Sequence, residues 1–108
     1  MAVYMTQFAY TTDAWAAFVR SPEDRSAGIK ALIEGVGGRI LDVYYSFGEY
    51  DGLLIFEAPD ETAAVAALIA AVAPGHLRAT KTTALFTLEQ GVEAMKKAGE
   101  LTYAGPKG

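Results

Sequence analysis

The sequence predicts an α+β fold with a four-stranded antiparallel sheet and two helices on one of its faces. Three observations support this prediction. Segments prone to strand and to helix follow one another in the order βαββαβ, the two main helical patterns end at glycines, and a capped helix follows the fourth strand. This order is the ferredoxin-like split βαβ arrangement. Because crossovers are right-handed, we expect both main helices on the same face, with the first and third strands central.

Composition limits the range of functions. The 108 residues suffice for one domain, expected over residues 1–98, with residues 99–108 as a C-terminal tail. The net charge of -4, without a visible Lys/Arg cluster, argues against nucleic acid as a partner. The absence of cysteine excludes disulfides and thiol catalysis. No signal peptide and no apolar run long enough for a bilayer appear, so we expect a cytoplasmic protein with no membrane partner.

The first half of the chain predicts one strand and two helical segments. Val3–Tyr10 is β-prone, and Thr11-Thr12-Asp13 offers capping oxygens for a short helix over Ala14–Arg20. Ser21-Pro22-Glu23-Asp24 is typical of a helix start, with Ser as the N-cap and Pro at the first helical position. The apolar stripe of that helix is Ile29, Leu32, Ile33 and Val36, and Gly37-Gly38 ends it.

The second half predicts three strands and two helices. Arg39–Phe47 forms a strand in which Leu41, Val43, Tyr45 and Phe47 share one face. The turn Gly48–Gly52 leads to the strand Leu53–Ala58. Asp60 caps a helix with Val65, Leu68, Ile69 and Val72 inward, and Leu77–Phe86 is the last strand. A capping box, Thr87 with Gln90, starts a final helix to about Ala98, with Leu88, Val92 and Met95 inward.

The apolar character of the strands predicts a homodimer or a higher homo-oligomer. A sheet covered on one side only should alternate apolar and polar residues, yet Leu53, Leu54, Ile55 and Phe56 are all apolar. A bare face of this kind would exceed the apolar patch that monomers usually expose. The simplest arrangement that covers it is a second copy packed sheet to sheet.

A family resemblance lies in the turn and the strand after it. Gly48-Glu49-Tyr50-Asp51, followed by the apolar strand and Glu57-Ala58-Pro59-Asp60, resembles the GYD-domain family, named for a Gly-Tyr-Asp signature. The likeness extends over about residues 1–90. It implies a relation to the dimeric α+β barrels, which include cofactor-independent monooxygenases, lyases, isomerases, haem-degrading enzymes and members without known activity. The resemblance therefore implies a dimer and leaves the activity open.

Two residues are candidates for proton transfer. Asp51 follows Tyr50 and is either part of a hairpin turn, with Gly52 supplying positive φ, or a general base or ligand anchor at the mouth of a pocket, with Tyr50 as its hydrogen-bond partner in orienting the ligand. His76, the only histidine, is either a surface or capping residue at the start of a strand, or else a proton shuttle or an axial metal or haem ligand. With one histidine and no cysteine, we expect no metal and no cofactor.

Aromatic and basic residues are candidates for ligand binding. Most aromatic side chains belong to the core or the dimer interface, but Trp15, Tyr45 and Phe47 could line a pocket between sheet and helices. Arg20 and Arg25 flank Ser21-Pro22, and each is either a solvated surface residue or a clamp for a carboxylate. The favoured function is binding of a small apolar or aromatic molecule. The alternatives are a cofactor-independent monooxygenase, isomerase or cyclase and a purely structural oligomer.

Overall fold

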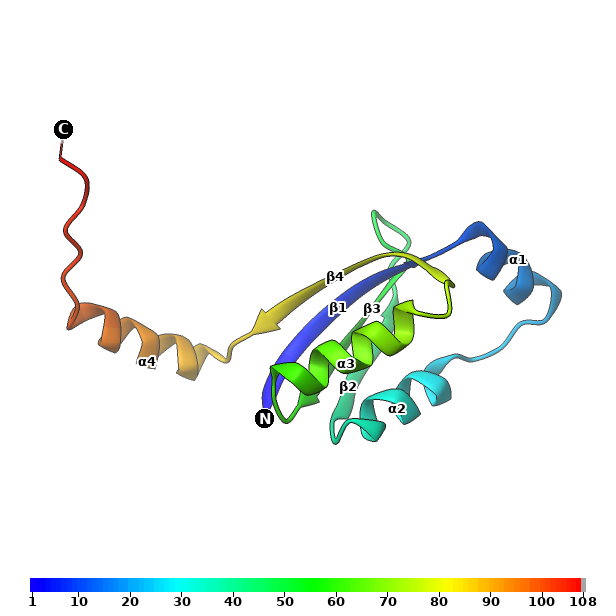
Figure 1. Cartoon of the computed structure of the whole chain (residues 1–108), viewed down its shortest axis with the longest axis horizontal. Helices are drawn as coiled ribbons and strands as arrows, with labels where there is room; N and C mark the ends of the chain where they lie inside the picture. The colour runs from blue at the N-terminus through cyan, green and yellow to red at the C-terminus, as the bar shows by residue number, and fades with distance from the viewer. Residues whose placement is uncertain (108) are drawn as a thin grey trace.

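The computed structural model describes residues 1–107, which form a four-stranded antiparallel sheet and four helices (Figure 1). The strands are β1 (Ala2–Tyr10), β2 (Arg39–Tyr45), β3 (Gly52–Ala58) and β4 (Leu77–Leu85). The helices are α1 (Thr12–Arg20), α2 (Ser26–Gly35), α3 (Glu61–Val72) and α4 (Leu88–Gly99). The strand order is β2-β3-β1-β4, so β1 and β3 are central, as the βαββαβ order predicts. The α+β, ferredoxin-like fold is confirmed.

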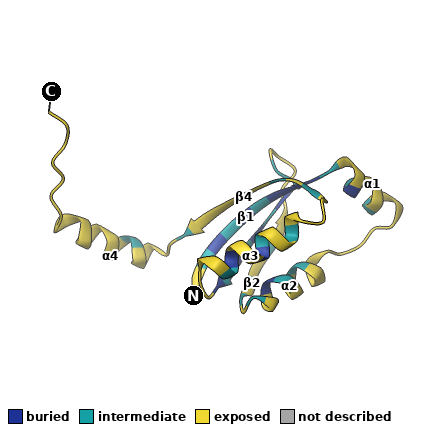
Figure 2. Cartoon of the chain, in the orientation of Figure 1, coloured by how far each residue is buried: buried dark blue, intermediate teal, exposed yellow. Residues whose placement is uncertain are grey.

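One face of the sheet carries the core. Register places Tyr4 opposite Phe56 and Thr6 opposite Leu54, so these side chains point to the same face. All four are buried, and helices α2 and α3 lie over them (Figures 1 and 2). The helices contribute the buried residues Ile33, Ala64 and Ala67. The core therefore lies between the two central strands and the two helices.

The opposite face of the sheet is the open face, defined by Val3 and Met5 of β1 and Leu53 and Ile55 of β3. All four side chains are only partly buried. Helices α2 and α3 both lie on the other side of the sheet (Figure 1). The second apolar face of β3, which the sequence predicts, is thus present and lacks a helix layer within residues 1–107.

The start of α2 differs from the sequence prediction. Ser21 does not cap this helix; it ends α1 with a non-helical backbone, φ -143° and ψ 81°, as a residue before proline favours, and its N–H donates to Ala17 O at 2.9 Å. Helix α2 begins instead at Ser26, whose N–H donates to Asp24 Oδ1 at 2.8 Å. The carboxylate of Asp24, the residue before the N-cap, thus accepts from the first N–H of the helix, because Asp bonds readily to the backbone two residues on.

Strand β2 contains an irregularity that changes which residues share a face. The register shifts between Ile40, which pairs with Phe56, and Asp42, which pairs with Ile55. The additional residue at this shift breaks the strict alternation, as a β-bulge does. Ile40, Val43 and Tyr45 therefore share the helix-covered face, so the prediction that Leu41 belongs with Val43 and Tyr45 was wrong.

Helix α3 packs on the sheet through its alanines. Ala64 and Ala67 are buried, whereas Val65, Ile69 and Val72 are 51%, 63% and 43% exposed, contrary to the predicted inward stripe. The sequence of α3 is apolar on every side, so spacing alone does not determine the buried face. Small side chains let the helix backbone lie close to the strands, and the larger residues point outward. The predicted cap is confirmed: Asp60 Oδ1 accepts from Ala63 N at 2.8 Å.

Helix α4 forms an arm that lies apart from the sheet (Figure 1). Its predicted capping box is present, with Gln90 N donating to Thr87 Oγ1 and Thr87 N donating to Gln90 Oε1. Leu88, Val92 and Met95 are 92%, 48% and 72% exposed, so the prediction that they point into the core was wrong. With 12 residues each, α3 and α4 are the longest helices of residues 1–107, and no helix in this range is long and apolar enough to cross a membrane. Gly108, the end of the predicted tail, lies outside the described residues.

Candidate functional site

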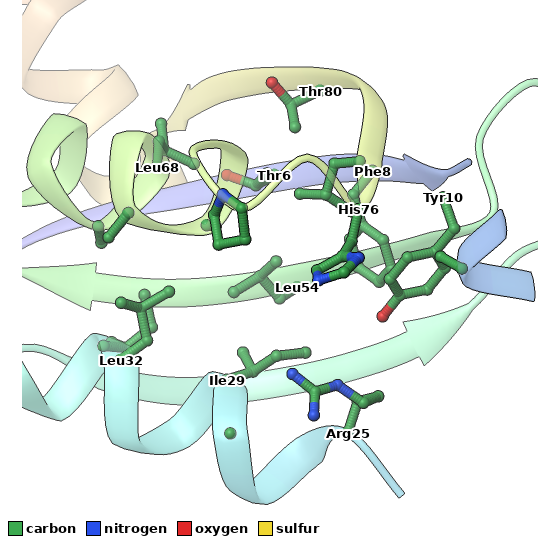
Figure 3. Close-up of a pocket in the computed structure, with 18 of the residues that line it drawn as sticks. Thr6, Phe8, Tyr10, Arg25, Ile29, Leu32, Leu54, Leu68, His76 and Thr80 are labelled. Atoms are coloured by element: carbon green, nitrogen blue, oxygen red, sulfur yellow. The ribbon is translucent and has the colours of Figure 1, made fainter. Parts of the chain in front are cut away.

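A cavity of about 480 Å³ lies between the sheet and helices α2 and α3 (Figure 3). We call it the helix–sheet cavity. Its sheet side is formed by Phe8, Leu54 and Phe56, and its helix side includes Ile29 of α2 and Leu68 of α3. On α3 the lining also includes Ala67, Ala70 and Ala71, whose side chains are small. Its lining is mostly apolar, as the walls of small-molecule sites usually are.

Polar side chains gather at one end of this cavity. Tyr10, Arg25 and His76 lie together there, close to the ends of β1 and α2 (Figure 3). Glu23 also lines the cavity, and its carboxylate is 3.0 Å from Arg25 Nη1. The cavity therefore has an apolar body and one polar end.

Tyr10 contributes a buried hydroxyl-bearing ring to the polar end. The residue is 8% exposed and packs edge to face against Phe18 and Trp15. Burial raises the pKa of Tyr10 above its ordinary value, and the neighbouring Tyr45 adds to the increase, while the Arg25 guanidinium opposes part of it. The Tyr10 hydroxyl is therefore protonated at neutral pH and able to donate a hydrogen bond.

Arg25 immediately precedes α2 as its N-cap residue. Its side chain folds back along the first turn, where Gly28 leaves room: a Cβ at Gly28 would lie 3.3 Å from Arg25 Nη2. Arg25 lines the helix–sheet cavity and also a smaller cavity of about 280 Å³ beside β2, which Asp24 and Tyr45 share. The guanidinium thus lies where the two cavities meet.

His76 lies in the connection between α3 and β4 and lines the helix–sheet cavity. Its backbone carbonyl accepts a hydrogen bond from Thr11 N at 2.9 Å, which ties this connection to the start of α1. The side chain is exposed, so it lies at the mouth of the cavity. Among residues 1–107 no three His, Asp or Glu side chains are close enough to hold a metal ion.

Asp51 is held by hydrogen bonds distant in sequence. Its Oδ2 accepts from Tyr10 N at 2.9 Å and from Trp15 Nε1 at 3.1 Å. Asp51 N in turn donates to Phe8 O at 2.8 Å. The carboxylate therefore joins the start of β3 to the end of β1 and to α1, and it does not line the helix–sheet cavity.

The glycine beside Asp51 is required by packing, not by a left-handed turn. A Cβ at Gly52 would lie 2.5 Å from the Phe8 ring and 2.8 Å from Tyr44 O. The residue of positive φ in this loop is Phe47, at 49°. The interpretation that Gly52 supplies positive φ in a hairpin turn was wrong, because a six-residue loop joins β2 and β3.

The predicted aromatic residues form a cluster outside the helix–sheet cavity. Trp15 lies 6.0 Å from Tyr45 and 5.7 Å from Phe47 between ring centroids, and Tyr45 and Phe47 stack at 5.5 Å. Tyr45 and Phe47 remain 52% and 69% exposed. Tyr45 lines the smaller cavity, so the structure joins this cluster to Arg25 through that cavity.

The remaining predicted site residues lie elsewhere. Tyr50 is partly buried in the β2–β3 loop, where its carbonyl accepts from Ser46 Oγ and Gly48 N. Arg20 is the exposed last residue of α1 and does not line the helix–sheet cavity. Of the residues named from sequence for catalysis or ligand binding, Arg25 and His76 are in its lining. Tyr10 and Ile29 were not named, although the alternation of β1 and the apolar stripe of α2 place both toward the sheet–helix space.

Comparison with known proteins decides the family. The model of the GYD domain matches residues 4–98. The chain belongs to the GYD-domain family. The match confirms the resemblance seen at Gly48–Asp51 and continues through most of α4.

Solved structures are similar to this GYD-family chain at low sequence identity. The crystal structure of MtbAldR matches with a TM-score of 0.56 and 18% identity over 80% of this chain and 52% of that chain, so the chain spans about half the length of MtbAldR. An uncharacterized NIPSNAP domain protein from Burkholderia xenovorans matches with a TM-score of 0.48 and 15% identity over 81% of this chain and 94% of that chain. The search of curated proteins gave no match. The likeness to MtbAldR supports the fold alone.

Proposed function

We propose that this GYD-family protein binds a small apolar or aromatic molecule in the helix–sheet cavity. The observation that supports the proposal is the cavity itself, whose volume of about 480 Å³ lies within the range of small-molecule sites. Its walls are mostly apolar side chains from β1, β3, α2 and α3, and its charged groups lie at one end, while Thr6 and Thr80 line it elsewhere. The polar end of such a site orients the ligand, and burial of the ligand's apolar surface against the walls holds it.

A cavity-filling variant tests this function. Ala71 lines the cavity from α3, whereas Ala66 is exposed on the same helix. Native mass spectrometry of protein purified from its own host is expected to detect a retained small molecule in the wild type and in Ala66→Phe. In Ala71→Phe the ligand is expected to be lost, because the added ring occupies the cavity. Retention of the same molecule by all three proteins would contradict the proposal.

A second candidate is a cofactor-independent enzyme that acts on a molecule in the same cavity. The observation that favours it is His76 at the cavity mouth, since an imidazole can transfer protons near neutral pH. The retained molecule, incubated with wild-type protein and with His76→Gln, distinguishes the two candidates. Conversion by the wild type alone supports the enzyme, whereas binding by both proteins without conversion supports the binder.

We also propose that two copies associate through their open faces. Support comes from Val3, Met5, Leu53 and Ile55, whose apolar side chains are only partly buried in the isolated chain. The arm α4 supports the same proposal, because its exposed Leu88 and Met95 need an apolar surface that the chain's own core does not provide. Light scattering is expected to give twice the mass of 11.5 kDa, or a higher multiple. A stable monomer would contradict it.

A further inference from the structure

Arg25 is the one Lys or Arg side chain among the residues that line the helix–sheet cavity in the described chain. The sequence offers Arg20 and Arg25 equally as carboxylate clamps, and the structure separates them. Arg20 ends α1 at the surface, whereas Arg25 lies at the polar end of the cavity beside Tyr10 and His76 (Figure 3). The polar end of the cavity therefore holds one positive charge, which is paired with Glu23.

The guanidinium of Arg25 keeps donors for a ligand. A guanidinium carries five N–H donors in a planar fork that matches a carboxylate. In the described chain, Arg25 Nη1 donates to Glu23 Oε1 at 3.0 Å. The other terminal nitrogen, Nη2, lies beside Gly28, and the Arg25 side chain as a whole is 45% exposed. Arg25 can therefore bind a second acid group.

The pair between Arg25 and Glu23 is easily displaced. The two side chains are 45% and 51% exposed and stand two residues apart in a linker. Exposed ion pairs of this kind contribute little to stability, since water competes for both partners. A carboxylate that enters with an apolar body also gains from burial of that body, so it can compete with Glu23 for the guanidinium.

We infer that the ligand of the helix–sheet cavity is an amphipathic monocarboxylic acid, with an aromatic or aliphatic body among Ile29, Leu54 and Leu68 and its carboxylate on Arg25. This inference rests on the proposed function. The protonated Tyr10 hydroxyl adds a donor to the same carboxylate. A cationic ligand is disfavoured because it would place its charge beside the Arg25 guanidinium.

Three probes of the same shape test the inference: 3-phenylpropionate, 3-phenylpropanamide and 3-phenylpropan-1-ol, titrated by calorimetry into the full chain. The acid is expected to bind at least tenfold more tightly than the amide or the alcohol. Arg25→Gln should remove this preference and leave the two neutral probes unchanged. Arg25→Lys should keep part of it, because lysine retains the charge without the planar fork. Arg20→Gln, the matched control, should behave as the wild type.

The outcomes separate the inference from the function on which it rests. Equal binding of acid, amide and alcohol would overturn the acid preference and leave the cavity as a binding site. A preference for the acid that persists in Arg25→Gln would also overturn it, since another cation would then be responsible. Binding of none of the probes, or equal binding by Ala71→Phe and wild type, would overturn the proposed function and this inference with it.

Discussion

The indole Nε1 of Trp15 donates a hydrogen bond to Oδ2 of Asp51 at 3.1 Å, across 36 positions of sequence. The same oxygen accepts from Tyr10 N. One carboxylate of the Gly-Tyr-Asp region thus fixes the first helix against the end of β1 and the start of β3. In this position Asp51 sets the shape of the end of the sheet from which Tyr10 reaches the cavity.

Removal of the Asp51 carboxylate should destabilise the protein. Asp51→Ala is expected to lower the free energy of unfolding by about 2–3 kcal/mol, because it leaves two N–H donors without their charged acceptor. Asp51→Asn should cost about 1 kcal/mol, since the amide oxygen can still accept. Urea denaturation measures both, with exposed Asp42→Ala as a control. Unchanged stability together with lost ligand retention would instead assign Asp51 to ligand binding.

The two glycines that flank Tyr50-Asp51 should respond differently to a methyl group. Gly52→Ala is expected to lower the free energy of unfolding by about 1–3 kcal/mol, because the added Cβ overlaps the Phe8 ring. Gly48→Ala should change it by less than about 0.5 kcal/mol, since nothing lies within 4 Å of its Cβ position. Thermal and urea unfolding of the pair measure the contrast. Equal changes in the free energy of unfolding for the two variants would show that close packing against Phe8 is not the reason for a glycine at position 52.

Stability should fall in alkaline solution through Tyr10. In the unfolded chain the tyrosine loses its proton near pH 10.0, whereas burial raises its pKa in the folded chain. Between these two values the unfolded state binds fewer protons, so the free energy of unfolding falls as the pH rises.

Tyr10→Phe tests this linkage. The variant is expected to lose less stability than the wild type between about pH 9 and about pH 11, measured by urea denaturation. Tyr103→Phe, at an 88% exposed position, should show the same loss as the wild type. An identical pH dependence of stability in Tyr10→Phe and the wild type would exclude Tyr10 as the source of the alkaline loss of stability.

A charge on the open face should dissociate the proposed dimer. Ile55→Lys places an ammonium group at the centre of the apolar surface that a second copy would cover, and burial of an unpaired charge there is costly. Light scattering is expected to give a monomer for this variant. Val19→Lys, at a 78% exposed position of α1, should keep the mass of the wild type. Unchanged mass for Ile55→Lys would show that the open face is not the interface.

The fold could be predicted because local signals agree with its topology. Asp60 and Thr87 cap the helices that follow them, Gly37 ends α2 at a positive φ of 82°, and the order of elements determines the strand order. The errors arose where a signal was ambiguous. Ser21-Pro22 has the chemistry of a helix start, but the nearer Asp24 caps the backbone instead. In α3, which is apolar on all sides, periodicity does not show that alanines face the sheet.

The site was harder to predict because it depends on distances between elements. Asp51 was correctly recognised as unusual, yet its partners Tyr10 and Trp15 are 41 and 36 positions away, and no local pattern indicates them. Arg20 and Arg25 are the same residue type on either side of Ser21-Pro22. They differ only in the side chains that the folded helices α1 and α2 bring next to them. Alanines of α3 line the cavity, and the sequence pattern does not reveal that they face the sheet.

The most direct test of the central claim is the set of backbone amide shifts, measured by nuclear magnetic resonance during titration of the full chain with 3-phenylpropionate. The account predicts that the largest shifts occur around the helix–sheet cavity, at Arg25, Ile29, Leu54 and Ala71, and that Ala71→Phe abolishes them. Shifts confined to the cluster of Trp15 and Phe47 or to the open face, with the cavity residues unchanged, would contradict it.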